Sequence, residues 1–249
     1  MFSPNGITTI LFDLDGTLRH SRPTMNQAFY KFAVELGLPE SAEGCRAALR
    51  WLHYYWAQSP ELLADLETYQ GKEESFWLNH ARLHLLAFGC PEDRLEALAP
   101  EISRRMYEEY EPEEWISPEV PEMLQALKQA GFTLGVVSNR TKPFGELLET
   151  LQLRSYFDYV LAAGEIKAWK PEPKIFQHAL AMLGASPEQT LYIGDNYYAD
   201  VVGAERAGLR PILLDPEGTF SEAACPVIQT IGQLAQVLEK ELPGNALAD

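Results

Sequence analysis

The spacing of apolar residues changes along the chain and divides it into segments of two kinds. Residues 7–12, ITTILF, are β-branched and apolar and stop at Asp13, which predicts a short buried β-strand. After residue 116, similar short runs alternate with segments that repeat apolar residues at helical spacing. The strands predicted there are 132–138, 157–164, 190–195, 210–215 and 227–231, and the helices are 122–131, 143–153, 173–184, 199–208 and 232–242.

Strands that alternate with helices predict a mainly parallel sheet with helices on both faces, a Rossmann-like α/β core. Residues 20–116 interrupt this pattern, because they are rich in Leu, Ala, Glu, Trp and Tyr and contain no convincing strand. Helical spacing recurs through them, for example in 91–110, where Pro100 is expected to kink the helix. We therefore expect an α/β core formed by 1–19 and 117–249, with a helical insertion after the first strand.

Composition narrows the class of protein. The chain has 249 residues and a formal net charge of −16, which argues against nucleic acid or an anionic membrane surface as a partner. Cys45, Cys90 and Cys225 are too few and too far apart for a disulfide framework, so we expect reduced thiols in the cytoplasm. Neither a signal peptide nor a membrane span is expected. The sequence does not distinguish a monomer from a homodimer.

Small polar and charged residues collect at the carboxyl ends of the predicted strands. In open parallel sheets these ends bind the ligand, so we expect the residues to line one pocket. They are Asp13, Asp15, Gly16 and Thr17 after the first strand, Ser138, Asn139 and Arg140 after the second, Lys170 in a loop, and Asp195, Asn196 and Asp200 after the fourth.

These residue types fit phosphoryl transfer with a bound Mg²⁺ ion. Asp13 and Asp15 are two positions apart, so both side chains can reach the same pocket. Proteins commonly hold Mg²⁺ with one or two carboxylates, together with water and substrate phosphate, and Asp13 and Asp195 would supply those carboxylates. The ion would offset the crowded negative charge and polarise a phosphoryl oxygen.

The neighbouring residues can bind the phosphate. We expect backbone N–H groups at Gly16, the Ser138 hydroxyl and the Lys170 ammonium to hold the phosphoryl oxygens, and Thr17 and Asn139 complete this predicted set. One aspartate of the first motif can attack phosphorus and form an aspartyl phosphate. The other can protonate the leaving oxygen and then take a proton from water.

Four motifs in order resemble the haloacid dehalogenase-like hydrolase superfamily over almost the whole chain. They are DLDGT at 13–17, Ser138, Lys170 within WKPEPKIF, and GDNYYAD at 194–200. Their order and spacing together make the resemblance specific. It implies a phosphatase-type member that acts on a small-molecule phosphate ester, and it implies that the insertion at 20–116 is a helical cap that closes over the substrate.

The resemblance also implies a role for each motif residue. Asp13 would be the nucleophile and a metal ligand. Asp15 would be the general acid and base, with its main-chain carbonyl as a further Mg²⁺ ligand. Asp195 would be a metal ligand as well. Asp200 would orient the lysine of the third motif or a metal-bound water, and Asn196 would support the site.

Features outside the motifs are open to two interpretations. His80 and His84 have a metal-binding spacing on a predicted helix, but no third ligand is apparent and a structural role is the simpler explanation. The aromatic stretch 51–56, WLHYYW, can line a substrate pocket or form the core of the insertion. Arg19, His20 and Arg140 lie beside the motifs and can touch substrate.

Other activities are alternatives to a phosphatase. A 2-haloacid dehalogenase of the same fold would need an attacking aspartate but neither Mg²⁺ nor Asp15. A phosphomutase or phosphonatase would share the nucleophile. A non-catalytic phospho-acceptor module also combines aspartates, a lysine and Mg²⁺ on a parallel sheet, although such modules are usually shorter and need no cap. The sequence favours a Mg²⁺-dependent phosphatase for phosphate monoesters and leaves the particular ester open.

Overall fold

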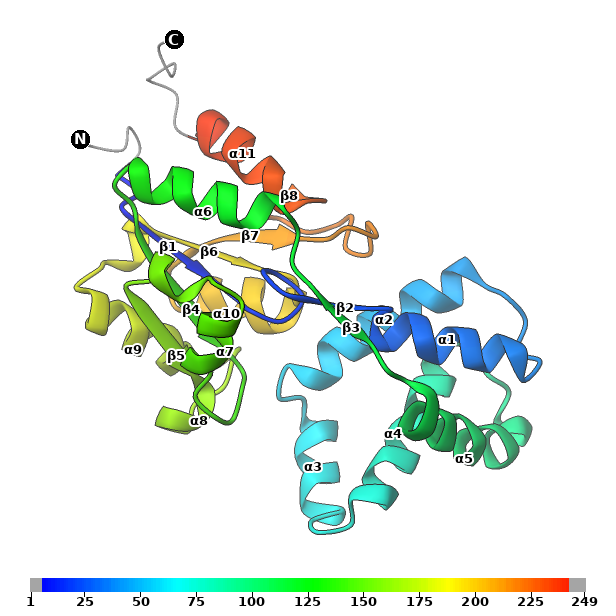
Figure 1. Ribbon diagram of the computed structural model, residues 1–249. Coiled ribbons are helices and arrows are strands. Elements are labelled where there is room, and N and C mark those ends of the chain that lie inside the picture. The colour runs from blue at the N-terminus through cyan, green and yellow to red at the C-terminus, as the bar shows by residue number, and fades with distance from the viewer. Residues whose placement is uncertain (1–5, 242–249) are drawn as a thin grey trace. The chain divides into compact units, whose positions relative to one another are not determined.

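The computed structural model describes residues 6–241, and Figure 1 shows the chain coloured along its length. Two compact units are present, one made of Met1–His20 and Ile116–Asp249 and the other of Ser21–Trp115. They are named the core unit and the insertion unit. Each unit packs around a hydrophobic core of its own.

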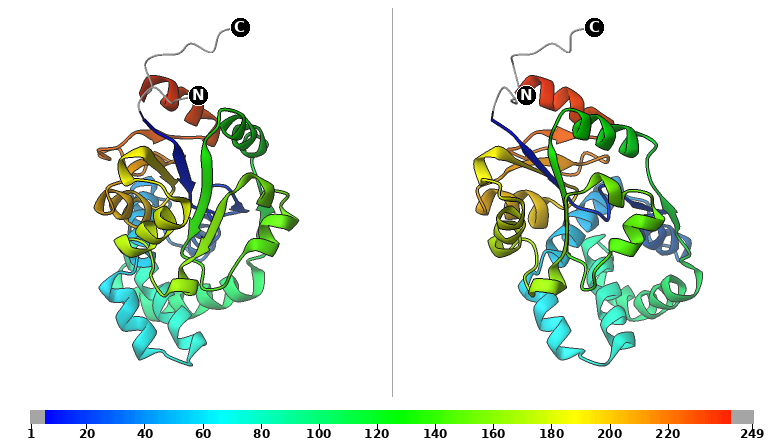
Figure 2. Two further views of the ribbon diagram at one scale, coloured as in Figure 1. Left: turned by 90° about the vertical axis from the view of Figure 1, so that its left-hand side faces the viewer. Right: turned by 60° about the vertical axis from the view of Figure 1, so that its left-hand side comes forward.

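A six-stranded parallel sheet forms the centre of the core unit (Figures 1 and 2). Its strand order is β5-β4-β1-β6-β7-β8, so the first strand of the chain lies in the middle. This confirms the predicted parallel α/β core, and each strand predicted for it is present in shortened form. The strands are β1 (Thr9–Phe12), β4 (Thr133–Ser138), β5 (Tyr159–Ala162), β6 (Thr190–Gly194), β7 (Arg210–Leu214) and β8 (Val227–Ile228).

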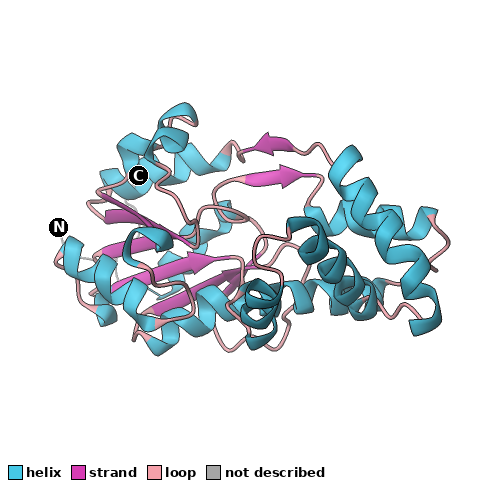
Figure 3. Cartoon of the chain, turned by 90° about the horizontal axis from the view of Figure 1, so that it is seen from below, coloured by secondary structure: helices cyan, strands magenta, loops and turns pink. Residues whose placement is uncertain are grey.

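Helices cover both faces of this sheet, because consecutive side chains of a strand point to opposite faces (Figure 3). Ile10 and Phe12 of β1 pack in one apolar cluster with α6, α7 and α11, whereas Leu11 packs in another with α9 and α10. The predicted last helix includes Leu242, which lies outside the described residues. The helices are α6 (Glu119–Gln129), α7 (Gly145–Thr150), α8 (Ala163–Ile166), α9 (Pro173–Leu183), α10 (Gly203–Arg206) and α11 (Leu234–Glu241), with 3₁₀ turns at Arg154–Tyr156, Pro187–Gln189 and Ile231–Gln233.

One predicted helix of the core unit has a different form. The pattern at 199–208 predicts a single α-helix, but the chain makes a π-helical turn, Tyr197–Val202, before α10. The Asn196 side chain caps this turn by accepting hydrogen bonds from the N–H groups of Tyr198 and Ala199, at 3.0 and 2.9 Å. Single π-helical turns are frequent at functional sites, and this one follows the carboxyl end of β6.

The insertion contains a short two-stranded sheet in addition to helices. The expectation that it has no strand is wrong, because β2 (His20–Arg22) pairs with β3 (Glu113–Trp115). Strands of three residues are too short to show an alternating apolar pattern. The Arg22 guanidinium lies 3.3 Å from the centre of the Trp115 ring, a contact that stabilises the pair. The helices are α1 (Met25–Glu35), α2 (Ala42–Trp56), α3 (Pro60–Thr68), α4 (Glu73–Ala87) and α5 (Glu92–Glu109).

Apolar side chains from four of these helices fill the core of the insertion unit. Phe29 of α1, Ala48 of α2, Leu85 of α4 and Ile102 of α5 belong to one buried cluster. α5 continues through Pro100 as one helix. Across residues 6–241, every helix is too short or too polar to span a lipid bilayer.

Candidate active site

The middle of the core sheet contains the point at which the strand order reverses. From β1 the chain moves outward to β4 and β5, and it then returns to the other side of β1 to add β6, β7 and β8. Open α/β sheets bind ligands at the carboxyl ends of the strands beside such a point. Asp13 and Asp15 follow β1, and Asp195 follows the adjacent β6. The topology therefore brings these acidic residues together.

Three carboxylates meet at this edge of the sheet. Asp13, Asp195 and Asp200 each offer one oxygen, and the three oxygens lie within 4.8 Å of one another. Within the described part of the chain, no other group of three His, Cys, Asp or Glu residues meets this spacing. A donor set made only of carboxylate oxygens suits a hard cation such as Mg²⁺. The residues present therefore fit a divalent metal ion.

Lys170 places a positive charge at the centre of this cluster. Its Nζ donates to Asp13 Oδ1 and Asp200 Oδ1, each at 2.6 Å, and to the Tyr192 hydroxyl at 3.0 Å. The Tyr192 hydroxyl in turn donates to the carbonyl of Val137 at 2.9 Å. Sequence reasoning missed Tyr192. Its signal is a phenol in an otherwise apolar buried strand, because such a hydroxyl needs a hydrogen-bond partner.

The charges of the cluster do not cancel, since it contains three carboxylates and one ammonium group, which pairs with Asp13 and Asp200. Burial raises the pKa of Asp13 to about 7, with Lys170 opposing the shift and Asp200 adding to it. Burial and the charges of Asp13 and Asp200 raise the pKa of Asp195 well above its ordinary value. With all three carboxylates ionised, the cluster would have an excess of two negative charges, which a divalent cation would balance.

Gly16 and Thr17 border the carboxylate of Asp195. Gly16 has φ +90°, and a Cβ atom there would lie 2.3 Å from Asp195 Oδ2, so the position requires glycine. The Thr17 hydroxyl donates to Asp195 Oδ1 at 3.2 Å. The Gly16 N–H, which was expected to face an anion, donates to the Arg19 carbonyl at 2.7 Å instead. In this structure both residues position the carboxylate, and their contact with phosphate stays a prediction.

The second motif is joined to the lysine of the third. Asn139 Nδ2 donates to the Lys170 carbonyl at 3.0 Å, and Asn139 Oδ1 accepts from the Lys170 N–H at 2.7 Å. The buried Ser138 hydroxyl accepts from the Arg140 N–H at 3.3 Å, and its own proton can be donated to a bound anion. Asn139 thus fixes the backbone that carries the ammonium group, and its direct contact with phosphate stays a prediction.

Asp200 is held by the turn that follows β6. Its Oδ2 accepts from the Asn196 N–H at 2.9 Å, while its Oδ1 accepts from Lys170. A Cβ atom at Gly194 would lie 2.2 Å from Asp200 Cγ, so a residue without a side chain is needed for this approach. The resemblance implies that Asp200 orients either Lys170 or a metal-bound water. The structure contains the contact with Lys170 that the first of these roles requires.

Two arginines hold the carboxylate of Asp15. Arg140 donates from Nε to Oδ2 at 2.7 Å and from Nη2 to Oδ1 at 2.8 Å, and Arg19 Nη1 donates to Oδ1 at 2.7 Å. Burial acts to raise the pKa of Asp15, but the hydrogen bonds and charges of Arg140 and Arg19 outweigh it and hold the pKa below its ordinary value. The sequence places both arginines beside the motifs, but it does not reveal that they share one carboxylate.

The paired histidines belong to the core of the insertion unit. His80 and His84 are both buried, and the Trp51 ring lies 5.2 Å from the first and 5.5 Å from the second. His84 Nε2 lies 3.1 Å from Asn26 Oδ1. Because no third ligand joins the pair among the described residues, the structural interpretation is favoured over a metal site. The stretch 51–56 packs around the same histidines.

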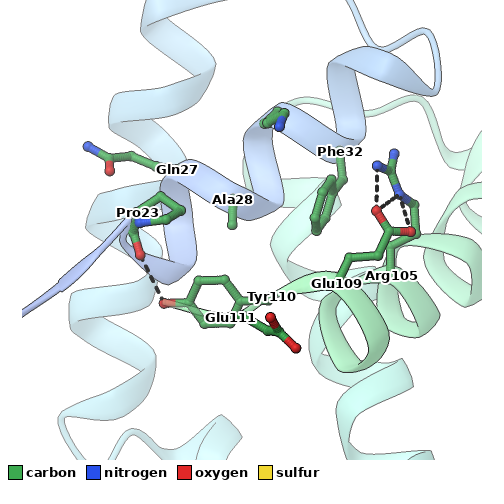
Figure 4. A pocket seen from close by; sticks show the side chains of 9 residues that line it. Pro23, Gln27, Ala28, Phe32, Arg105, Glu109, Tyr110 and Glu111 are labelled. Atoms are coloured by element: carbon green, nitrogen blue, oxygen red, sulfur yellow. Dashed lines mark hydrogen bonds and ion pairs between the residues drawn. The ribbon is translucent and has the colours of Figure 1, made fainter. Parts of the chain in front are cut away.

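A pocket of about 310 Å³ lies within the insertion unit (Figure 4). Arg105 bonds Glu109 at 2.8 Å on its wall and lies over the Phe32 ring at 4.1 Å. The Tyr110 hydroxyl donates to the carbonyl of Pro23 at 3.2 Å. These groups contact one another and include none of the predicted site residues, so the candidate active site is the carboxylate cluster of the core unit.

Comparison with known proteins identifies the family. The family model described as haloacid dehalogenase-like hydrolase matches residues 7–208, a range that contains the whole cluster. The chain belongs to the haloacid dehalogenase-like hydrolase family. It is 29% identical over 226 residues to a phosphoglycolate phosphatase of Salmonella choleraesuis, covering 87% of this chain and 84% of that protein. It is 28% identical over 212 residues to pyrophosphatase PpaX of Bacillus cereus, covering 82% and 81%.

Solved structures of the family share the fold. A crystal structure of a 2-haloacid dehalogenase from Pseudomonas syringae superimposes with a TM-score of 0.53 and 26% identity, covering 94% of this chain and 99% of that one. Membership of the family makes this chain a hydrolase with a Rossmann-like core. The named relatives include both phosphatases and a dehalogenase, so the residues of the site must decide between these activities.

Proposed function

We propose that this chain is a Mg²⁺-dependent phosphatase that hydrolyses small-molecule phosphate monoesters through an aspartyl phosphate. The contact of Lys170 with Asp13 inside the three-carboxylate cluster carries the proposal. A carboxylate nucleophile needs cationic groups beside it to approach a negatively charged phosphoryl group. The names of the relatives, a phosphoglycolate phosphatase and a pyrophosphatase, support the same class of reaction.

Asp13 and Asp15 of the first motif would take part in both chemical steps. In the first step the Asp13 carboxylate forms a bond to phosphorus, and the ester oxygen leaves with the bonding electron pair and takes a proton from Asp15. Asp15 must be protonated for this step, a form that its contacts with Arg140 and Arg19 disfavour, so these contacts must weaken when the substrate binds. In the second step Asp15 accepts a proton from water, whose oxygen bonds to phosphorus. The bond between phosphorus and Asp13 then breaks, which releases inorganic phosphate and restores the carboxylate.

The other residues would bind the metal ion and the phosphoryl group and hold them in position. Asp13 and Asp195 would hold Mg²⁺ together with the main-chain carbonyl of Asp15, and the bound ion would supply Lewis-acid stabilisation of the phosphoryl oxygens. The Ser138 hydroxyl and the Lys170 ammonium would bind those oxygens. Gly16, Thr17, Asn139, Asn196 and Asp200 would support these groups through the contacts described above.

Asp15 favours a phosphatase over a dehalogenase. Displacement of a halide from carbon needs no proton donor, whereas an alkoxide leaving group does. The three-carboxylate cluster also suits a metal ion, which the dehalogenase reaction does not need. The insertion at 20–116 would be the cap that excludes water during phosphoryl transfer.

The test uses the full chain and an aryl phosphate. Hydrolysis should stop with a chelator and return with Mg²⁺. Asp13→Asn should lower kcat by about a thousandfold or more while the circular dichroism spectrum is retained. Glu149→Gln, a matched change at an exposed carboxylate of α7, should keep wild-type activity. Chelator-resistant hydrolysis or substantial turnover by Asp13→Asn would contradict the proposal, and chloride release from a 2-chloroacid without metal would favour a dehalogenase.

A further inference from the structure

Asp15, Arg19 and Arg140 form a charged group in the more accessible part of the site. The side chains of Arg140 and Asp15 are 33% and 40% exposed, whereas those of Lys170 and Asp200 are 3% and 1% exposed. A phosphoryl group that reaches Lys170 would therefore be buried. The remainder of the substrate, which becomes the leaving group, would lie in the accessible part with the arginines.

Two arginines gather at the carboxylate of Asp15. The guanidinium groups of Arg19 and Arg140 both pair with it, whereas the buried carboxylates of Asp13 and Asp200 share the single ammonium group of Lys170. A chain of net charge −16 thus places two guanidinium groups beside the proposed leaving group.

The geometry of Arg140 suits the recognition of a planar anion. Its Nε and Nη2 donate side by side to the two oxygens of Asp15, at 2.7 and 2.8 Å. The same fork fits a carboxylate or a phosphoryl group of a ligand. In the proposed mechanism the leaving oxygen must come within hydrogen-bond reach of the Asp15 carboxylate. A substituent on the leaving group would therefore lie beside the guanidinium of Arg140.

We propose that Arg140, with Arg19 beside it, is a specificity-determining residue that binds a second anionic group on the leaving-group side of the substrate. This inference rests on the proposed phosphatase function and narrows its substrates to phosphate compounds whose leaving group carries a carboxylate or a further phosphate. On binding, Arg140 exchanges part of its contact with Asp15 for the substrate anion. Arg19 keeps its bond to Asp15 Oδ1, so the carboxylate stays oriented.

The test compares phosphate compounds with and without a second negative charge on the leaving-group side. Phosphoglycolate and hydroxyethyl phosphate differ only by a carboxylate in place of a neutral hydroxymethyl group, and pyrophosphate, an anhydride with a better leaving group, tests a phosphoryl group. The wild-type enzyme should prefer phosphoglycolate over hydroxyethyl phosphate by about tenfold or more in kcat/KM, or Arg140→Gln should lower kcat/KM for pyrophosphate by more than it does for hydroxyethyl phosphate. Arg140→Gln should remove most of this preference, mainly through KM. Lys142→Gln removes an exposed charge from the same loop and should retain the preference.

The outcomes separate the inference from the proposed function. Loss of preference for phosphoglycolate alone identifies a carboxylate as the bound anion, and loss for pyrophosphate alone identifies a phosphate. The inference is overturned if the wild-type enzyme has no preference, or if Arg140→Gln lowers kcat/KM for all three substrates by one factor, because Arg140 then only holds Asp15. The proposed function fails separately if the wild-type enzyme with Mg²⁺ hydrolyses neither these compounds nor an aryl phosphate.

Arg140→Lys provides a second variant, which keeps the charge but loses the fork. Its preference should lie between those of the wild type and Arg140→Gln. Circular dichroism and thermal unfolding establish that each variant is folded. If Arg140→Gln fails to fold, the wild-type preference and its change in Arg140→Lys decide the question, and an unchanged preference in Arg140→Lys then counts against the inference.

Discussion

Lys170 Nζ lies 2.6 Å from Asp13 Oδ1, and both side chains are buried. The contact joins the end of the first strand to a loop far along the sequence, so the fold and the candidate site depend on the same ion pair. Asp200 bonds the same ammonium at 2.6 Å. Two buried carboxylates thus share one cation.

Removal of this cation should destabilise the fold strongly. Lys170→Met leaves Asp13 and Asp200 as neighbouring buried carboxylates, and the free energy of unfolding should fall by about 3 kcal/mol or more in the presence of a chelator. Lys128→Met is the matched control, because it breaks an exposed ion pair with Asp158 and should cost less than about 1 kcal/mol. Urea unfolding measures the free energy of unfolding of both variants. Equal losses would show that the buried ion pair of Lys170 stabilises the fold no more than the exposed pair of Lys128.

The proposed role of Asp15 predicts a dependence on the leaving group. Asp15→Asn should lower kcat for an alkyl phosphate by about a hundredfold or more, because the alkoxide needs a proton as it leaves. An aryl phosphate has a better leaving group and should lose less activity in the first step. Steady-state kinetics over a series of leaving groups measures the slope. Equal losses across the series would exclude Asp15 as the proton donor, and Glu149→Gln again controls for loss of charge.

Much of the core unit could be predicted because its signals are local. The run 7–12 followed by Asp13 and Gly16 is a buried strand that ends in a turn, and the alternation after residue 116 fixes a parallel sheet. Parallel strands place their carboxyl ends at one edge of the sheet. The alternation of strands and helices therefore already predicts that the acidic residues after β1 and β6 lie close together.

The remaining features depend on contacts between segments far apart in the sequence. Tyr192 looks like one more core residue until its hydroxyl is seen between Lys170 and the carbonyl of Val137. The fork of Arg140 on Asp15 joins two loops, and no spacing within either loop predicts it. The backbone freedom of Gly16 predicts a turn that presents N–H groups to an anion, but its tight approach to a carboxylate appears only in three dimensions.

Replacement of Gly16 should separate backbone strain from the position of Asp195. Gly16→Ala and Gly131→Ala both place a side chain at φ near +90°, and each should cost about 1–2 kcal/mol of stability. A Cβ at Gly131 meets no atom within 4 Å, whereas a Cβ at Gly16 meets the Asp195 carboxylate. Gly16→Ala alone should therefore weaken activation by Mg²⁺, by about tenfold or more in the concentration required. Equal activation curves for the two variants would contradict the proposed role of Asp195 as a ligand.

The buried histidines of the insertion unit predict how stability depends on pH. Burial lowers the pKa of His80 to about 4, and burial together with the charge of His80 lowers the pKa of His84 well below its ordinary value. Between pH 4 and 6.5 the unfolded chain binds protons that the folded chain does not. The stability that neutral His80 provides is therefore present above pH 6.5 and is lost as the pH falls toward 4.

His80→Phe isolates this contribution, because the raised pKa of Asp13 changes stability in the opposite sense over the same range. The difference in unfolding free energy between wild type and variant should shift in favour of the variant by up to about 3 kcal/mol as the pH falls from 6.5 to 4. Urea unfolding at several pH values measures the difference. Parallel curves for the two proteins would show that folding leaves the pKa of His80 unchanged, which would contradict the prediction.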